Sequence, residues 1–164
     1  MRIGTGYDSH RFDEDRELVL GGVLIPGHAG LTGHSDGDAV AHAIIDAILG
    51  AAAAGNVGAH FPPTDDSWKD ADSIDLLRRS VEILSERGYH VSNIDATVVC
   101  ETPRIGPYAE AMRERLATAM EVAVSQVSIK GKTNEHMGWI GRGEGLAVHA
   151  VALIERIPTS GSAQ

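Results

Sequence analysis

The segment from Leu146 to Ile157, LAVHAVALIERI, limits the architecture more than any other part of the chain. Its side chains alternate as in a β-strand, yet both alternating sets are largely apolar, so we expect both faces of this strand to be covered. Helices of the same chain can cover one face, and a dimeric or trimeric interface would cover the other. Further segments with strand character are residues 1–12, 16–26, 92–100 and 125–130.

Three segments have the hydrophobic period of a helix. The first is expected over residues 36–54 with Ser35 as its N-cap, and the second runs from its N-cap Ser73 to Gly88. A third helix is expected to begin at Pro107, because proline suits the first helical position. The glycines around residues 27–33 and the long segments 55–73 and 131–145 are predicted to be loops.

Composition excludes several classes of protein. The 164 residues fit one domain, expected over residues 1–157, with a disordered tail over residues 158–164. A net charge of -9 and the lack of a basic stripe argue against nucleic-acid binding. One cysteine, with no apolar leader and no apolar run near the length of a membrane span, predicts a soluble cytoplasmic protein without a membrane partner.

One cluster of polar residues has the character of a metal site. In GHSDGDAVAH, His34, Asp38 and His42 follow one another at four-residue steps. Asp8 and His10 lie two residues apart on a predicted strand and should therefore point the same way. One aspartate and two histidines suit a zinc ion with an open fourth position, although the Asp8–His10 spacing alone also occurs by chance on surfaces. His34 could support the metal or bind phosphate, or it could simply cap the loop.

Two glycine-rich segments imitate nucleotide-binding motifs without completing them. GKT at residues 131–133 lacks the earlier glycine of a P-loop, because Gln126 stands there. GTG at residues 4–6 has Ser9 where a dinucleotide fingerprint needs a third glycine. The loop that follows GKT nevertheless offers phosphate donors in Lys132, Thr133 and Arg142 and an oxygen ligand for Mg²⁺ in Glu135, unless it is an ordinary charged turn.

Six segments together resemble the family of 2-C-methyl-D-erythritol 2,4-cyclodiphosphate synthases, in its order and spacing over residues 1–157. They are GYDSHRF, GHSDGDAVAHAIIDAILGAAA, GNVGAHFPPTD, ADS, ETPRIGPY and KTNEHMGWIGRGEG. The resemblance implies an α+β fold, with a mixed β-sheet covered by helices on one face, that assembles as a homotrimer with active sites between neighbours. It also implies a phosphorus–oxygen lyase of non-mevalonate isoprenoid (terpenoid) biosynthesis, which converts 4-diphosphocytidyl-2-C-methyl-D-erythritol 2-phosphate to the cyclic diphosphate and CMP.

The resemblance also implies roles for individual residues. It places Zn²⁺ on Asp8, His10 and His42, a second divalent cation, Mg²⁺ or Mn²⁺, on Glu135, and the catalytic phosphate contacts on His34 and Thr133. The loop 56–65 is implied to hold the methylerythritol part, and residues 100–106, with Lys132 to Glu135 from the adjoining subunit, the cytidine. The implied substrate contacts are Ser35, Asn56, Val57, Gly58, Phe61, Pro62, Pro63, Thr64, Asp65, Cys100, Glu101, Thr102, Pro103, Arg104, Ile105, Gly106, Lys132, Asn134, Trp139 and Arg142.

Three positions depart from the family pattern. Asn56 replaces a common aspartate, Tyr7 replaces a common phenylalanine, and the residues around Thr133 differ. Tyr7, Arg142 and Glu144 match residues beside a threefold axis, where the family has a cavity that can hold an isoprenoid diphosphate. Two other functions stay open at this point. One is a zinc-dependent phosphohydrolase with Asp38 or Asp46 as its base, and the other is a non-catalytic isoprenoid- or metal-binding trimer.

Overall fold

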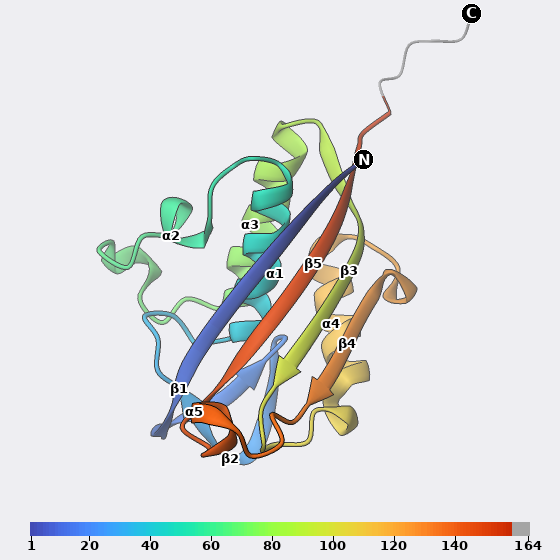
Figure 1. Ribbon diagram of the computed structural model, residues 1–164. Helices are drawn as coiled ribbons and strands as arrows, with labels where there is room; N and C mark the ends of the chain where they lie inside the picture. The colour runs from blue at the N-terminus through green and yellow to red at the C-terminus, as the bar shows by residue number, and fades with distance from the viewer. Residues whose placement is uncertain (159–164) are drawn as a thin grey trace, which may run out of the picture.

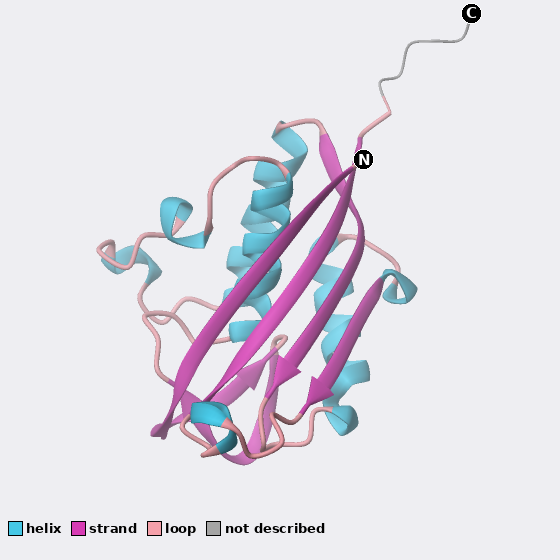
Figure 2. Ribbon diagram, viewed as in Figure 1, coloured by secondary structure: helices cyan, strands magenta, loops and turns pink. Residues whose placement is uncertain are grey.

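The computed structural model describes residues 1–158 as one mixed five-stranded sheet with helices on one face (Figures 1 and 2). The strand order is β2-β1-β5-β3-β4, and β3 pairs with β4 in parallel while the other pairs are antiparallel. The strands are β1 (Arg2–Leu20), β2 (Val23–Leu31), β3 (Tyr89–Val99), β4 (Val127–Lys132) and β5 (Gly145–Arg156). The α+β class and the one-sided helix layer are therefore confirmed.

Three long helices form that layer, and short helical turns lie in the loops. The long helices are α1 (Ala39–Ala51), α3 (Ser73–Glu86) and α4 (Ala109–Met120). The short elements are α2 (Val57–His60), η1 (Asp66–Trp68), η2 (Gly106–Tyr108), η3 (Val124–Gln126) and α5 (Gly138–Gly141). Both predicted long loops thus contain helical turns, and Pro107 lies in η2 before α4 begins.

The first two strands differ from the prediction. β1 is continuous across the two segments that were expected to be separate, and β2 begins after a turn at Gly21 and Gly22, both with positive φ. Of the loop expected over residues 27–33, residues 27–31 belong to β2. Pro26 and Gly27 fall between the paired positions Ile25 and Ala29, where the ladder is irregular. A bulge on this edge strand accommodates a proline without losing a central hydrogen bond.

Asp38 is the N-cap of α1, not Ser35 as predicted. Its buried carboxylate accepts hydrogen bonds from the amides of Val40 and Ala41, both 3.0 Å away. It also accepts from the amides of Gly21 at 2.8 Å and Gly22 at 2.6 Å, so that one side chain ties the β1–β2 turn to the helix. Burial, followed by the nearby charge of Asp36, raises the pKa of Asp38 to about 6. With both oxygens occupied, Asp38 is not available as a catalytic base.

Replacing Asp38 with asparagine should lower the free energy of unfolding by about 1–3 kcal/mol. In either orientation of the side-chain amide, its NH₂ group would face backbone N–H donors and could not accept their hydrogen bonds. Urea denaturation would measure the change. Asp72→Asn is the matched control: Asp72, rather than Ser73, caps α3 by accepting from the Ile74 amide at 2.8 Å. Asparagine is as good a cap as aspartate, so this control should change stability little. Equal losses in both variants would contradict the anchoring role of Asp38.

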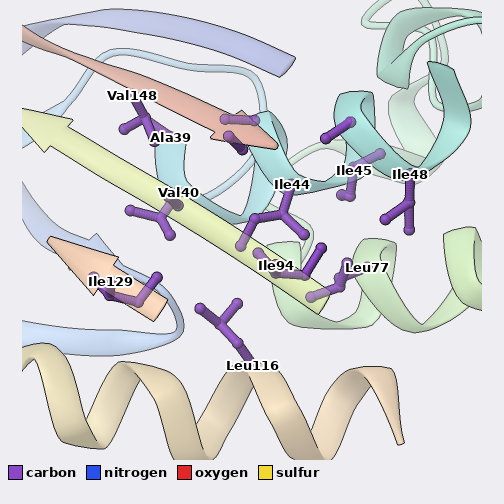
Figure 3. Close-up of a cluster of buried hydrophobic side chains, with 14 of the residues drawn as sticks. Ala39, Val40, Ile44, Ile45, Ile48, Leu77, Ile94, Leu116, Ile129 and Val148 are labelled. Atoms are coloured by element: carbon purple, nitrogen blue, oxygen red, sulfur yellow. The ribbon is translucent and has the colours of Figure 1, made fainter. Parts of the chain in front are cut away.

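Helix α1 is buried on nearly every side. Val40, Ile44 and Ile48 are fully buried, and Figure 3 shows them among side chains from α3, α4 and the sheet. On the sheet side, a Cβ added to Gly4 would lie 2.1 Å from the Ala47 carbonyl oxygen, and one added to Gly6 would lie 1.9 Å from that of Ala43. The glycines of the GTG segment therefore allow α1 to pack closely against β1. The motif thus has a structural role that needs no bound nucleotide.

Residues 1–158 leave the opposite face of the sheet open. Ile3, Tyr7 and Val151 there are 69%, 51% and 44% exposed. The second cover expected for β5 does not come from the described residues. Among those residues, no helix is long and apolar enough to span a membrane. The tail predicted to be disordered falls, apart from Pro158, outside the described part of the chain.

Candidate metal centre and substrate cavities

Asp8, His10 and His42 meet beside the N-terminal end of α1. Asp8 and His10 project from the helix-covered face of β1, as their two-residue spacing predicted, and His42 lies in the first turn of α1. The Asp8 Oδ2 atom is 2.8 Å from His10 Nε2 and 3.1 Å from His42 Nδ1. One ligand atom from each residue lies within 4.8 Å of the others, a spacing that could hold one metal ion. Two imidazoles and one carboxylate form a donor set that suits zinc.

Charge and outer contacts favour ligand binding by these atoms. Burial alone would raise the pKa of Asp8, but hydrogen bonds from His10 and His42 outweigh it, so the pKa lies well below its usual range. The carboxyl is therefore ionised, as a metal ligand must be. His10 Nδ1 contacts the Thr32 carbonyl oxygen, which can only accept a hydrogen bond. This contact keeps the Nδ1 proton in place and directs Nε2 toward Asp8.

The triad forms one wall of a cavity of about 270 Å³. Apolar side chains also line the cavity, among them Phe61 and Trp68, whose rings meet edge to face with centroids 5.1 Å apart. His34 also lines the cavity, and its buried Nε2 atom has no hydrogen-bond partner among the described residues. Of the predicted site residues, those that line this cavity are Asp8, His10, His34, Ser35, His42, Val57, Gly58, Phe61 and Pro63.

Asp46, which lines the cavity, holds the loop after α1 in place. Its Oδ1 atom accepts a hydrogen bond from the Val57 amide at 2.7 Å, and burial raises its pKa. Asn56 caps α2 by accepting from the Ala59 amide at 3.0 Å, so its oxygen is engaged in the loop itself. Asp65 likewise caps η1 through the Ser67 amide. Pro62, Thr64 and Asp65 are not among the residues that line the cavity.

A second cavity, of about 310 Å³, lies where β3 and β4 end. Because these strands are parallel neighbours, the loops that follow them start at the same edge of the sheet. Lys132 and Thr133 therefore lie beside residues 100–106 of the same chain, which corrects the expectation that they come from an adjoining subunit. The lining residues are Cys100, Glu101, Pro103, Arg104, Ile105, Gly106, Gly131, Lys132 and Thr133.

Glu101 organises this edge. Its carboxylate accepts hydrogen bonds from the amides of Asn134 at 3.0 Å and His136 at 3.1 Å, which spans the turn that carries Glu135. Thr133 Oγ1 in turn donates to Glu135 Oε1 at 3.2 Å. Glu101 thus shapes the loop as well as lining the cavity. The predicted contacts Thr102, Asn134, Trp139 and Arg142 and the predicted ligand Glu135 do not line it.

The two cavities share no lining residue. Asp8 pairs with Val148, Val148 with Val98, and Val98 with Gly131, so the triad and the second cavity stand three strands apart. Three inter-strand spacings amount to roughly 14 Å. Trp139 borders another hollow with Ser9, His10, Arg11 and Glu144, and Arg142 Nε donates to Glu144 Oε1 at 2.7 Å on the surface. One chain therefore carries two separate halves of the predicted site.

Sequence reasoning missed several residues that hold the site together. Arg16 donates to the carbonyl oxygens of Gly33 and Ser35, and thereby fixes the segment that carries His34. Trp68 covers the cavity and lies under the Arg79 guanidinium, 5.4 Å from the ring centroid. Ser73 contacts the ring of His42 and donates a hydrogen bond to Asp36. A single arginine or tryptophan matches no sequence motif, so the roles of Arg16 and Trp68 could not be predicted. Ser73 was predicted only as a helix cap.

Residues 1–155 match the sequence profile of the YgbB family. The chain belongs to the YgbB family. A 2-C-methyl-D-erythritol 2,4-cyclodiphosphate synthase of Symbiobacterium thermophilum is 58% identical over 154 residues, which cover 94% of this chain and 98% of that one. This identity over nearly the full length establishes the chain as a cyclodiphosphate synthase, a phosphorus–oxygen lyase of the non-mevalonate isoprenoid pathway.

Solved structures agree with the sequence comparison. The bifunctional IspDF of Campylobacter jejuni superposes with a TM-score of 0.92 at 38% identity, over 95% of this chain but 42% of that one, so the chain spans less than half of that relative. IspF of Plasmodium falciparum, solved as a CDP complex, has a TM-score of 0.83 at 33% identity and is covered over 97% of its length, with 96% of this chain. The family named from the sequence motifs is confirmed.

Proposed function

We propose that the chain converts 4-diphosphocytidyl-2-C-methyl-D-erythritol 2-phosphate to 2-C-methyl-D-erythritol 2,4-cyclodiphosphate and CMP. In this reaction the 2-phosphate of the substrate attacks the β-phosphorus, and the bond from that phosphorus to CMP breaks. The convergence of Asp8, His10 and His42 on one wall of a cavity is the observation that carries the proposal. The attacking phosphate is already an anion, so the protein needs chiefly to orient the substrate and offset its charge.

The metal ligands are part of the same proposal. Asp8, His10 and His42 would hold Zn²⁺, and Glu135 would hold a second divalent ion, Mg²⁺ or Mn²⁺. Such ions, when bound, neutralise phosphate charge and polarise the phosphorus–oxygen bonds. His34 lies beside the triad in the same cavity, so its ring is placed to hydrogen-bond a phosphate oxygen there. Thr133, at the rim of the second cavity, offers a hydroxyl for the same purpose.

The two cavities suit different parts of the substrate. We assign the second cavity, with residues 100–106 and Lys132, to the cytidine. The Plasmodium falciparum relative, solved as a CDP complex, supports a cytidine nucleotide as the ligand. The cavity under Phe61 and the loop 56–65 is assigned to methylerythritol. Pro62, Thr64, Asp65, Thr102, Asn134, Trp139 and Arg142 would reach the substrate from the rims of these cavities or from a neighbouring subunit.

A homotrimer would bring the two halves together. The apolar, exposed face around Ile3, Tyr7 and Val151 supports such an assembly, because it is the uncovered side of a strand that is apolar on both faces. The metal centre of one subunit would then adjoin the cytidine cavity of the next. Tyr7 packs against His149 with ring centroids 4.9 Å apart, and this pair with the Arg142–Glu144 ion pair would line the axial cavity proposed for an isoprenoid diphosphate.

Turnover in ¹⁸O-labelled water tests the chemistry. With Zn²⁺ and Mg²⁺ supplied, the diphosphocytidyl substrate should yield CMP and the cyclic diphosphate in equal amounts, with no solvent oxygen in either product, because both phosphates come from the substrate. Mass spectrometry measures the label. Label in the products would contradict cyclisation and favour the zinc-dependent phosphohydrolase. No turnover at all would favour a non-catalytic metal- or isoprenoid-binding trimer.

A further inference from the structure

Behind His42, on the side away from Asp8, two polar side chains form a short hydrogen-bonded chain. His42 Nε2 lies 2.9 Å from Ser73 Oγ, and Ser73 Oγ in turn donates to Asp36 Oδ1. Ser73 is fully buried at the first position of α3, and the Ser73 amide donates to the other Asp36 oxygen at 3.0 Å. The chain therefore reaches from a carboxylate through a hydroxyl to the histidine that faces Asp8.

The donors and acceptors in this chain can be arranged in one way when Asp36 is ionised. The carboxylate can only accept hydrogen bonds, so the Ser73 hydroxyl must donate its proton to Asp36. The Ser73 oxygen then has lone pairs left for His42, and His42 Nε2 must carry the proton between them. The Nδ1 atom of the same ring, 3.1 Å from Asp8 Oδ2, is left as the ligand atom, and the proton that it shares with Asp8 would be released when a metal binds.

We propose that Ser73 and Asp36 are positioning residues that fix the ring of His42, with its Nε2 proton held by Ser73, so that Nδ1 is presented to the metal. The inference rests on the proposed metal centre and assigns it two residues that touch neither metal nor substrate. Such outer partners orient a ligand and commonly change metal affinity about 10- to 100-fold when they are removed.

The same pair connects the metal centre to the segment that precedes α3. Asp36 also receives the Asp38 amide at 3.1 Å, and its own amide donates to the Ala71 carbonyl oxygen at 3.2 Å. Ala71 lies between Trp68, which lines the cavity, and the start of α3. The orientation of His42 and the position of Ala71 thus both depend on Asp36, the first through its carboxylate and the second through its backbone amide.

Zinc affinity of the full chain, measured by competition with a chromophoric chelator, tests the proposal. Ser73→Ala should weaken zinc binding about 10-fold or more. Ser35 Oγ lies 3.1 Å from His42 Nε2 and can take over part of the contact, so the double variant Ser35→Ala/Ser73→Ala should weaken it further. Ser80→Ala is the matched control, since Ser80 is equally buried on α3 but donates to the Leu76 carbonyl oxygen at 2.8 Å. It should bind zinc within about two-fold of the wild type.

A second measurement is NMR of the zinc-loaded protein. In the zinc-loaded wild type, the His42 Nε2 proton should give a downfield, slowly exchanging NMR signal, which Ser73→Ala should lose and Ser80→Ala should keep. Wild-type affinity in the double variant, or a His42 Nε2 proton that exchanges rapidly with water in the zinc-loaded wild type, would overturn the role of Ser73 and Asp36 and leave the proposed function intact. A wild type that binds no zinc at His42 would overturn the metal centre and this inference together.

Discussion

Replacing Gly6 with alanine is expected to prevent α1 from docking on β1. The new Cβ would lie 1.9 Å from the Ala43 carbonyl oxygen and 2.9 Å from the Ala47 amide nitrogen, and backbone atoms cannot rotate away as a flexible side chain can. The helix would have to move outward from a close-packed interface, which we expect to cost more than about 3 kcal/mol. The protein should be largely unfolded, or should lose zinc even where secondary structure persists.

Gly50→Ala is the matched control for this substitution. Gly50 is an exposed residue of α1, and its added Cβ would lie 3.9 Å from the Thr5 carbonyl oxygen, which is an ordinary contact. Because alanine is the better helix former, this variant should be unchanged or up to about 1 kcal/mol more stable. Urea unfolding followed by circular dichroism, together with zinc content, would compare the two. A Gly6→Ala protein as stable as the wild type would show that the close approach is not required.

The sequence predicted the architecture better than the boundaries of its elements. Alternation in residues 146–157 and the helical period of residues 36–54 depend on burial, which a pattern of apolar residues records directly. The N-cap of α1 could not be predicted from such a pattern. Ser35 has the better local pattern, but Asp38 caps the helix because two amides of the distant β1–β2 turn also bind its carboxylate. That contact depends on tertiary structure, which no local pattern encodes.

The same distinction holds for the candidate site, where some residues follow from local patterns and others depend on tertiary contacts. Asp8 and His10 could be paired from a two-residue spacing because a strand has that period, and His42 is brought to them by the predicted helix. Glu101 was expected to contact cytidine, yet its carboxylate holds the loop around Glu135, since the turn that follows the neighbouring strand β4 presents two amides to it. Roles of this kind follow from which loops meet at a sheet edge, and the residue type alone does not reveal them.

Replacing His42 with alanine should reduce turnover by about 10³-fold or more, with the fold kept, because a metal ligand that stabilises developing charge commonly contributes several kcal/mol. His42 reaches Asp8 and two serines through its ring, and alanine suits the helix that carries it. The variant should therefore remain folded and of the same size as the wild type in solution, while it binds little zinc. Mass spectrometry of the metal content, beside size-exclusion chromatography, measures both.

His90→Ala provides the comparison for this variant, because His90 lies on β3, far along the sheet from the triad, and its ring Nδ1 contacts the neighbouring Val91 carbonyl oxygen. That protein should keep zinc, size and turnover. If His42→Ala were inactive but bound zinc as the wild type does, the ion would be held elsewhere. The meeting of Asp8, His10 and His42 would then be a hydrogen-bonded cluster that supports the fold, and the phosphate charge would have to be offset by other groups of the chain, such as His34 and Lys132.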